Sequence, residues 1–198
     1  MDIIIAASKN KHKIEEMDAI TRELGMHILP RDEAGIPDDF EIEEDGQTFE
    51  ENSFKKANEI MRLSGNTAIA DDSGLEVEYL GGAPGIYSAR FAGEDCTDKK
   101  NNVKLLTLLE GVPYKERKAK FVSVITVVFP NGETVVARGE CPGHILMEPL
   151  GQNGFGYDPL FVPDGYQRTF AEFTNDEKNK ISHRARALKK LSEMLKER

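Results

Sequence analysis

The stretch Ile3-Ile4-Ile5-Ala6-Ala7, followed directly by Ser8-Lys9-Asn10-Lys11-His12-Lys13, decides the fold class. An unbroken apolar run is typical of a strand that is buried on both of its faces. Apolar side chains then recur at helical spacing over residues 14–24, and Gly25 is placed to cap the end of a helix. A buried strand, a basic loop and an amphipathic helix in this order form half of a βαβ unit.

The rest of the chain continues this alternation of strands and helices. Further helices are predicted from capping residues and helical spacing at 48–65, 98–110 and from Thr174 onward. The buried face of the second is expected to carry Phe54, Ala57, Ile60 and Met61. Further strands, bounded by turn residues, are predicted at 67–70, 75–80, 121–129 and 133–138. The last two strands are joined by Asn131-Gly132, a hairpin-turn pair. The pattern predicts an α/β fold with a mixed β-sheet and flanking helices, in a single domain over residues 1–198.

Composition excludes several classes of protein. The chain has 198 residues, and its hydrophobic content of 39% excludes a disordered protein. Its net charge is −9, so we do not expect it to bind nucleic acids. Two distant cysteines, Cys96 and Cys141, form neither a disulfide scaffold nor a zinc ribbon. No apolar run approaches the about 18 residues of a membrane helix, and residues 1–7 do not resemble a signal peptide. We therefore expect no membrane partner and a cytoplasmic location.

The basic loop at residues 8–13 is a candidate anion site. A loop that leads into a helix presents unpaired backbone N–H groups where the helix dipole favours negative charge. Three lysines add formal positive charge there, and Ser8 and Asn10 add neutral donors. Taken alone, the loop is equally compatible with an ordinary solvated surface.

Carboxylates follow the predicted strand 67–70 in the sequence Asp71-Asp72-Ser73-Gly74. Because neighbouring strand residues point to opposite faces, only one of the two aspartates is expected to face a given site. A carboxylate beside a phosphate is repelled unless Mg²⁺ bridges the two. The acidic run Glu43-Glu44-Asp45 could supply a second carboxylate, although such a run by itself is more typical of a solvated surface. The competing interpretation of the segment is a simple Asp-Ser-Gly turn.

Two further segments carry groups suited to a nucleobase. Gly154-Phe155-Gly156-Tyr157-Asp158-Pro159 places an aromatic ring between glycines, which allows close approach and stacking. Near the C-terminus, Lys178, His183 and Arg184 offer hydrogen-bond donors for a ring carbonyl or a phosphate. A turn with a core aromatic residue and a basic helix surface are the respective alternatives.

Taken in series, these motifs closely resemble the inosine/xanthosine triphosphate pyrophosphatase family. The resemblance runs from about residue 3 to residue 195 and rests on the segments 8–13, 70–75, 81–90, 154–159 and 182–184. It implies an elongated, two-lobed α/β fold with a central cleft, found as a homodimer. It also implies Mg²⁺-dependent hydrolysis of ITP, dITP and XTP to the monophosphate and pyrophosphate, which removes these non-standard nucleotides from the nucleotide pool.

The resemblance also implies roles for particular residues. The triphosphate would be bound by Ser8, Lys9, Asn10, Lys11, His12 and Lys13, and Ser73 would contact the substrate. Asp72 would be the catalytic residue and, with Glu44, a metal ligand. The nucleotide and its base would be bound by Phe155, Gly156, Tyr157, Asp158, Lys178, His183 and Arg184. This chain departs from the family at two positions of the loop: the family usually carries glycine where this chain has His12, and often where it has Lys9.

Three alternative functions remain open from the sequence. A Maf-type nucleotide pyrophosphatase would prefer pyrimidine or modified nucleotides. A nucleotide-binding protein without turnover would use the same loop and aromatic segment, but carboxylates near phosphates would not help it unless it holds a metal ion. A nucleic-acid binder would require a continuous basic surface and would show a steep salt dependence of binding.

Overall fold

The computed structural model describes residues 3–23, 25–37 and 39–197 of the chain. Within them a sheet has the strand order β2-β1-β3-β4-β5-β6. Its strands are β1 (Ile3–Ala6), β2 (His27–Pro30), β3 (Ala68–Val77), β4 (Lys118–Val128), β5 (Thr134–Ile145) and β6 (Phe161–Pro163). β1 pairs in parallel with β2 and β3, whereas β5 and β6 are antiparallel. The predicted α/β fold with a mixed sheet is confirmed.

Local capping signals fix where the helices begin and end. The helices are α1 (Lys11–Glu23), α2 (Phe49–Ser64), α3 (Asp98–Leu108), α4 (Asn175–Ile181) and α5 (His183–Lys196). The side chain of Thr48 accepts a hydrogen bond from the N–H of Glu51, and Gly65 ends α2 with φ 68°. Thr97 caps α3 in the same way as Thr48 caps α2. Leu24, the last apolar residue of the first predicted helix, lies outside the described residues. Among the described helices, none is long and apolar enough to span a bilayer.

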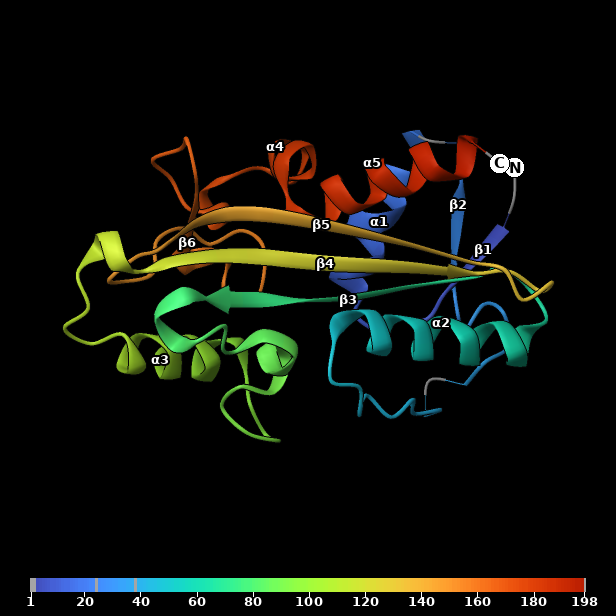
Figure 1. Cartoon of the computed structure of the whole chain (residues 1–198), viewed down its shortest axis with the longest axis horizontal. Helices are drawn as coiled ribbons and strands as arrows, with labels where there is room; N and C mark the ends of the chain where they lie inside the picture. Colours follow the sequence, from blue (N-terminus) through green and yellow to red (C-terminus); the bar gives the residue numbers. More distant parts are fainter. Residues whose placement is uncertain (1–2, 24, 38, 198) are drawn as a thin grey trace. The chain divides into compact units, whose positions relative to one another are not determined.

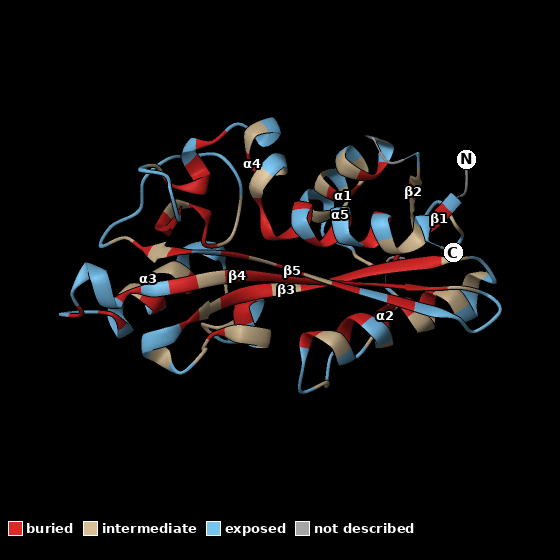
Figure 2. Ribbon diagram, turned by 45° about the horizontal axis from the view of Figure 1, so that its top comes forward, coloured by how far each residue is buried: buried red, intermediate tan, exposed pale blue. Residues whose placement is uncertain are grey.

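The chain divides into two compact units. The first comprises the chain up to Asp72, Ser123–Gly139 and the chain from Arg184 onward, and the second comprises Ser73–Val122 and Glu140–His183. Each unit has its own core, and the residues buried in these cores are drawn in red in Figure 2. The elongated, two-lobed outline with a central cleft and the single domain over 1–198 stay predictions.

In the first unit, helices cover both faces of the strands. α1 and α5 lie on one side of β1 and β3, and α2 lies on the other (Figure 1). Strand residues therefore alternate between two cores: Ile69 packs in the cluster that contains Met17, whereas Ala68 and Ala70 pack in the cluster that contains Ile60. This alternation positions the two aspartates that follow along β3.

In the second unit, α3 and a group of aromatic rings form the core. Leu105 of α3 is fully buried in the cluster that contains Phe121, Phe161 and Phe170. The ring centroids of Phe121 and Phe161 are 4.7 Å apart. Tyr157 belongs to the same cluster, so this core supports the segment 154–158.

Four predictions about the fold were wrong. The separate strands 67–70 and 75–80 are one strand, β3, because Asp71 and Asp72 are buried with charged partners and the backbone does not turn. Phe54 is 44% exposed, since the buried stripe of α2 is centred on Phe49, Ala57 and Ile60. The predicted C-terminal helix is broken at Ser182, where ψ is 161° and the backbone is extended. Residues 11–13 belong to α1 rather than to a loop. In addition, the short strands β2 and β6 were not predicted.

Candidate active site

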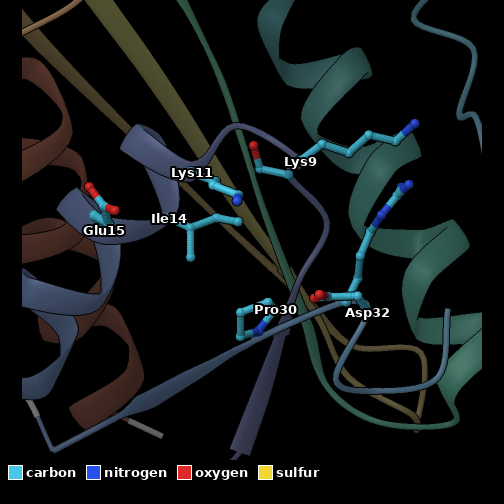
Figure 3. A pocket seen from close by; sticks show the side chains of 8 residues that line it. Lys9, Lys11, Ile14, Glu15, Pro30 and Asp32 are labelled. Carbon is cyan, nitrogen blue, oxygen red and sulfur yellow. The ribbon is translucent and has the colours of Figure 1, made fainter. Parts of the chain in front are cut away.

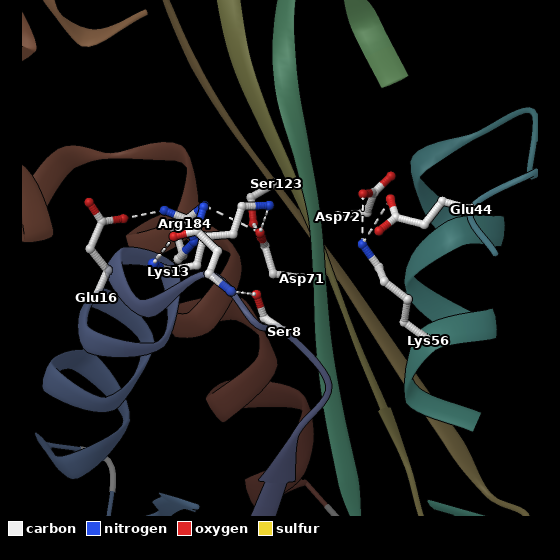
Figure 4. Close-up of polar contacts among 10 residues, drawn as sticks. Ser8, Lys13, Glu16, Glu44, Lys56, Asp71, Asp72, Ser123 and Arg184 are labelled. Carbon is white, nitrogen blue, oxygen red and sulfur yellow. Dashed lines mark hydrogen bonds and ion pairs between the residues drawn. The ribbon is translucent and has the colours of Figure 1, made fainter. Parts of the chain in front are cut away.

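Asp71 and Asp72 project from opposite faces of β3 (Figure 4). Asp71 contacts residues of α1 and α5, and Asp72 contacts a residue of α2. The prediction that the two carboxylates face different surroundings, made from the strand period alone, is confirmed.

Lys56 of α2 brings Asp72 and Glu44 together. Its Nζ lies 2.9 Å from Asp72 Oδ1 and 3.4 Å from Glu44 Oε2. Burial raises the pKa of Asp72 above its ordinary value, and the Lys56 cation offsets part of that rise. Burial would lower the pKa of Lys56, but the two carboxylates outweigh it and raise that pKa. Lys56 is not among the residues predicted from the sequence, although a lysine on the buried stripe of α2 beside Ala57 was a usable signal.

Asp72 retains one carboxylate oxygen with no hydrogen bond. Its Oδ2 is buried and has no partner among the described residues. An unsatisfied buried acceptor costs about 1–3 kcal/mol, more when charged, so such an atom points to a missing cation or donor. The described residues contain no cluster of three or more metal-ligating side chains. Mg²⁺ is commonly held by only one or two carboxylates, with water and substrate phosphates completing its shell. Asp72 and Glu44 therefore fit this ion.

Asp71, which is fully buried, is the centre of a second network. Its carboxylate accepts a hydrogen bond from Ser123 Oγ at 2.5 Å and lies 2.9 Å from Lys13 Nζ and 3.2 Å from Arg184 Nη2. Arg184 also pairs with Glu16. Burial alone would raise the pKa of Asp71, but Arg184, Lys13 and Ser123 hold it well below its ordinary value. Asp71 is thus an anchor that fixes Lys13 and Arg184.

The segment that joins β1 to α1 has the form of a helix N-terminus. Asn10 Oδ1 accepts a hydrogen bond from the N–H of Lys13, and Ser8 Oγ accepts one from the N–H of Asn10. Lys9 pairs with Glu41. No described residue other than glycine has a positive φ, so Lys9 and His12 do not require glycine's freedom.

A cavity of about 500 Å³ lies beside this helix N-terminus (Figure 3). Ligand pockets commonly enclose about 300–1,000 Å³, so a small molecule fits this volume. Its walls are formed by Ser8, Lys9, Lys11, Ile14, Glu15, Pro30, Arg31 and Asp32. Three residues of the predicted phosphate site therefore line one cavity.

Residues 154–158 form a tight turn in the second unit. The N–H of Phe155 donates to Asp158 Oδ2 at 2.9 Å, and Lys178 Nζ lies 2.7 Å from the same oxygen. The Lys178 ammonium is also 4.8 Å from the centroid of the Phe155 ring. Gly154 has φ 71°, and a Cβ there would meet Asp158 Oδ2 at 2.1 Å. The structure thus brings three of the predicted base-binding residues, Phe155, Asp158 and Lys178, into contact.

The other predicted base-binding residues have separate partners. Tyr157 is buried, which raises the pKa of its hydroxyl, and it donates to the carbonyl of Ser88 at 2.7 Å. The His183 ring stacks on Phe121 with centroids 4.8 Å apart, whereas Arg184 is held by Asp71 and Glu16. Adjacent in sequence, His183 and Arg184 thus have different surroundings. Ser73 is half-buried in β3.

Comparisons with known proteins agree over nearly the whole chain. The model of the Ham1 family matches residues 4–194. A dITP/XTP pyrophosphatase of Clostridium perfringens is 55% identical over 99% of this chain and 98% of its own length. One of Desulforamulus reducens is 50% identical over 97% and 94%, respectively. A HAM1 protein from Coxiella burnetii superposes with a TM-score of 0.88 at 42% identity, covering 100% of both chains.

Proposed function

The chain belongs to the Ham1 family, and from this we propose that it hydrolyses ITP, dITP and XTP to the monophosphate and pyrophosphate. Relatives named dITP/XTP pyrophosphatases, at least half identical to it over nearly their whole length, support this activity. The observation that carries the proposal in the structure is the buried Asp72 carboxylate. Its Oδ2 has no hydrogen-bond partner among the described residues, and Glu44 contacts the same lysine, Lys56, as Asp72 does. Such a carboxylate suits a site where a cation and phosphate oxygens meet.

Mg²⁺ is the proposed cofactor, and Asp72 and Glu44 are the residues that would hold it. When bound, the ion would neutralise charge on phosphate oxygens and acidify coordinated water. Lys56 lies against both carboxylates, and its cation offsets part of the rise that burial causes in the pKa of Asp72. This contact holds the two carboxylates on the same ammonium group, where a cation could join them.

Different residues of the chain carry out different parts of the reaction. Asp72 orients a water molecule and accepts its proton as the water oxygen bonds to the α-phosphorus. The bond between that phosphorus and the bridging oxygen breaks, and the bridging oxygen leaves with pyrophosphate. Positive charge and donors for the triphosphate come from Ser8, Lys9, Asn10, Lys11, His12 and Lys13, with a further substrate contact from Ser73. As in other phosphoryl transfers, positioning and electrostatic stabilisation supply most of the rate.

Base recognition is assigned to Phe155, Gly156, Tyr157, Asp158, Lys178, His183 and Arg184. The Phe155 ring offers a stacking face, and its contact with Lys178 fixes its orientation. Cationic donors favour the 6-oxo group of hypoxanthine or xanthine, whereas the 6-amino group of adenine is itself a donor. Donors left unpaired by the wrong base can give strong discrimination.

The same proposal includes a homodimer in the cytoplasm that removes non-standard purine nucleotides from the nucleotide pool. Neither a nucleic acid nor a membrane is required as a partner. The net charge of −9 disfavours binding to nucleic acids and to anionic membranes, which supports the expectation that neither is a partner.

A substrate panel tests the activity. We expect pyrophosphate from ITP, dITP and XTP with Mg²⁺, and a rate with ATP lower by at least about 10²-fold, because a donor-lined site would leave donors unpaired with adenine. The products are identified by ion chromatography. A preference for pyrimidine or modified nucleotides would favour the Maf-type alternative. Binding of nucleotides without their hydrolysis would favour a nucleotide-binding protein that is not an enzyme. Release of orthophosphate would overturn the assigned bond.

Lys56→Met tests the electrostatic role of Lys56. Because the Lys56 cation lowers the pKa of Asp72, its removal raises that pKa, and more Asp72 is protonated at a given acidic pH. The acid limb of the kcat/KM profile should move up by about one pH unit or more. Lys55→Met is the matched control, since Lys55 pairs with Asp45 instead. An acid limb that moves equally in both variants, or in neither, contradicts this role.

A further inference from the structure

Side chains of α3 hold both backbone groups of Gly156. The N–H of Gly156 donates to Asp98 Oδ2 at 2.7 Å, and Asn102 Nδ2 donates to the Gly156 carbonyl at 3.0 Å. Asp98 and Asn102 are four positions apart and therefore lie on the same face of the helix. All three residues belong to the second unit. We call Asp98 and Asn102 the α3 clamp.

The α3 clamp leaves one of its own polar atoms unsatisfied. Asn102 Oδ1 is buried and has no hydrogen-bond partner among the described residues. Turning the amide over would not help, because it would place this oxygen against the Gly156 carbonyl, which is also an acceptor. An unsatisfied buried acceptor costs about 1–3 kcal/mol. Side chains that lower the stability of the fold in this way, with no compensating contact, are expected mainly at functional positions.

The clamped residue lies between groups assigned to the nucleobase. Phe155 precedes Gly156, and its N–H donates to Asp158, which pairs with Lys178. The backbone on either side of Phe155 sets where its ring begins, and the contact with Lys178 then orients the ring. Fixing both backbone groups of Gly156 therefore fixes the ring and the Asp158 carboxylate together before a ligand arrives.

We propose that Asp98 and Asn102 are positioning residues that preorganise the turn 155–158 for a purine base. This inference rests on the proposed function, because that function assigns base recognition to these residues. A site that is already ordered loses less conformational entropy on binding, so the clamp strengthens binding of the base. It leaves the chemical step at the phosphates unchanged.

Alanine and conservative substitutions of the clamp provide the test. In the double variant Asp98→Ala/Asn102→Ala we expect KM for ITP to rise about tenfold, as for the loss of about 1.4 kcal/mol of binding, with kcat unchanged. Asp98→Asn keeps an acceptor for the Gly156 N–H, so it should retain a KM near that of the wild type. Lys99→Ala is the matched control, an exposed position between the two on α3. Hydrogen exchange of the amides at 155–158 should quicken in the double variant only.

Binding of IMP, measured by calorimetry, separates this inference from the proposed function. If the wild type turns over no nucleotide but the double variant binds IMP about tenfold more weakly, the proposed function fails and the clamp is supported. Equal IMP affinities of the two proteins, or no binding to either, overturn the clamp. Faster exchange with an unchanged KM, a loss confined to kcat, or an equal effect of Lys99→Ala also overturns it.

Discussion

Asp72→Asn is expected to lower kcat for ITP hydrolysis by about 10²–10⁴-fold, the usual contribution of a positioned general base. An amide of the same size cannot accept the proton of the attacking water, and it is a poorer ligand for a divalent cation. Because Lys56 and Glu44 still face each other at 3.4 Å, we expect the variant to fold. Product analysis at saturating ITP measures the loss.

The matched control for this variant is Asp45→Asn. Asp45 is an exposed carboxylate that precedes α2 and pairs with Lys55 of that helix. The control should keep the activity of the wild type. If Asp72→Asn retains more than about a tenth of wild-type kcat, the role of Asp72 as general base is wrong.

Asp71→Ala is expected to have the largest effect on stability. Removing one member of a buried ionic network typically costs about 3–5 kcal/mol, because the partners are left buried without compensation. In this chain Lys13 and Arg184 would both lose their ion pair with Asp71, and Arg184 is only 1% exposed. Urea unfolding followed by circular dichroism measures the free energy of unfolding.

Glu50→Ala is the control for this loss of stability. Glu50 forms a partly exposed ion pair with Arg138 at 2.9 Å, and such pairs contribute little because water and salt screen them. We expect Glu50→Ala to change the free energy of unfolding far less than Asp71→Ala. Equal losses in the two variants would mean that the Asp71 network does not stabilise the fold.

The parts of the fold that the sequence predicted depend on local signals. The first strand follows from an unbroken apolar run, and α2 and α3 from a threonine cap at each start. The course of the chain at Asp71 could not be read in this way, because the residues that keep it in a strand come from elsewhere. Arg184, for example, is 113 positions away from Asp71. Strands as short as β2 and β6 likewise depend on their neighbours in the sheet.

In the candidate site too, local features could be predicted from the sequence, whereas contacts between distant residues could not. The period of a strand was enough to predict that Asp71 and Asp72 face different surroundings. It could not predict that Lys56 would join Asp72 to Glu44, since that contact requires the loop before α2 to fold back on the helix. The contacts of Gly156 with Asp98 and Asn102 span 58 and 54 positions and had no local signature.

Hydrolysis of ITP in ¹⁸O-labelled water shows which phosphorus the attacking water bonds to. The proposed reaction forms its new bond at the α-phosphorus, so the label should appear in the phosphate of IMP and be absent from pyrophosphate. The Asp72→Asn variant should form labelled IMP about 10²–10⁴-fold more slowly, with the label still in IMP. Label in pyrophosphate, or release of labelled orthophosphate, would contradict the account.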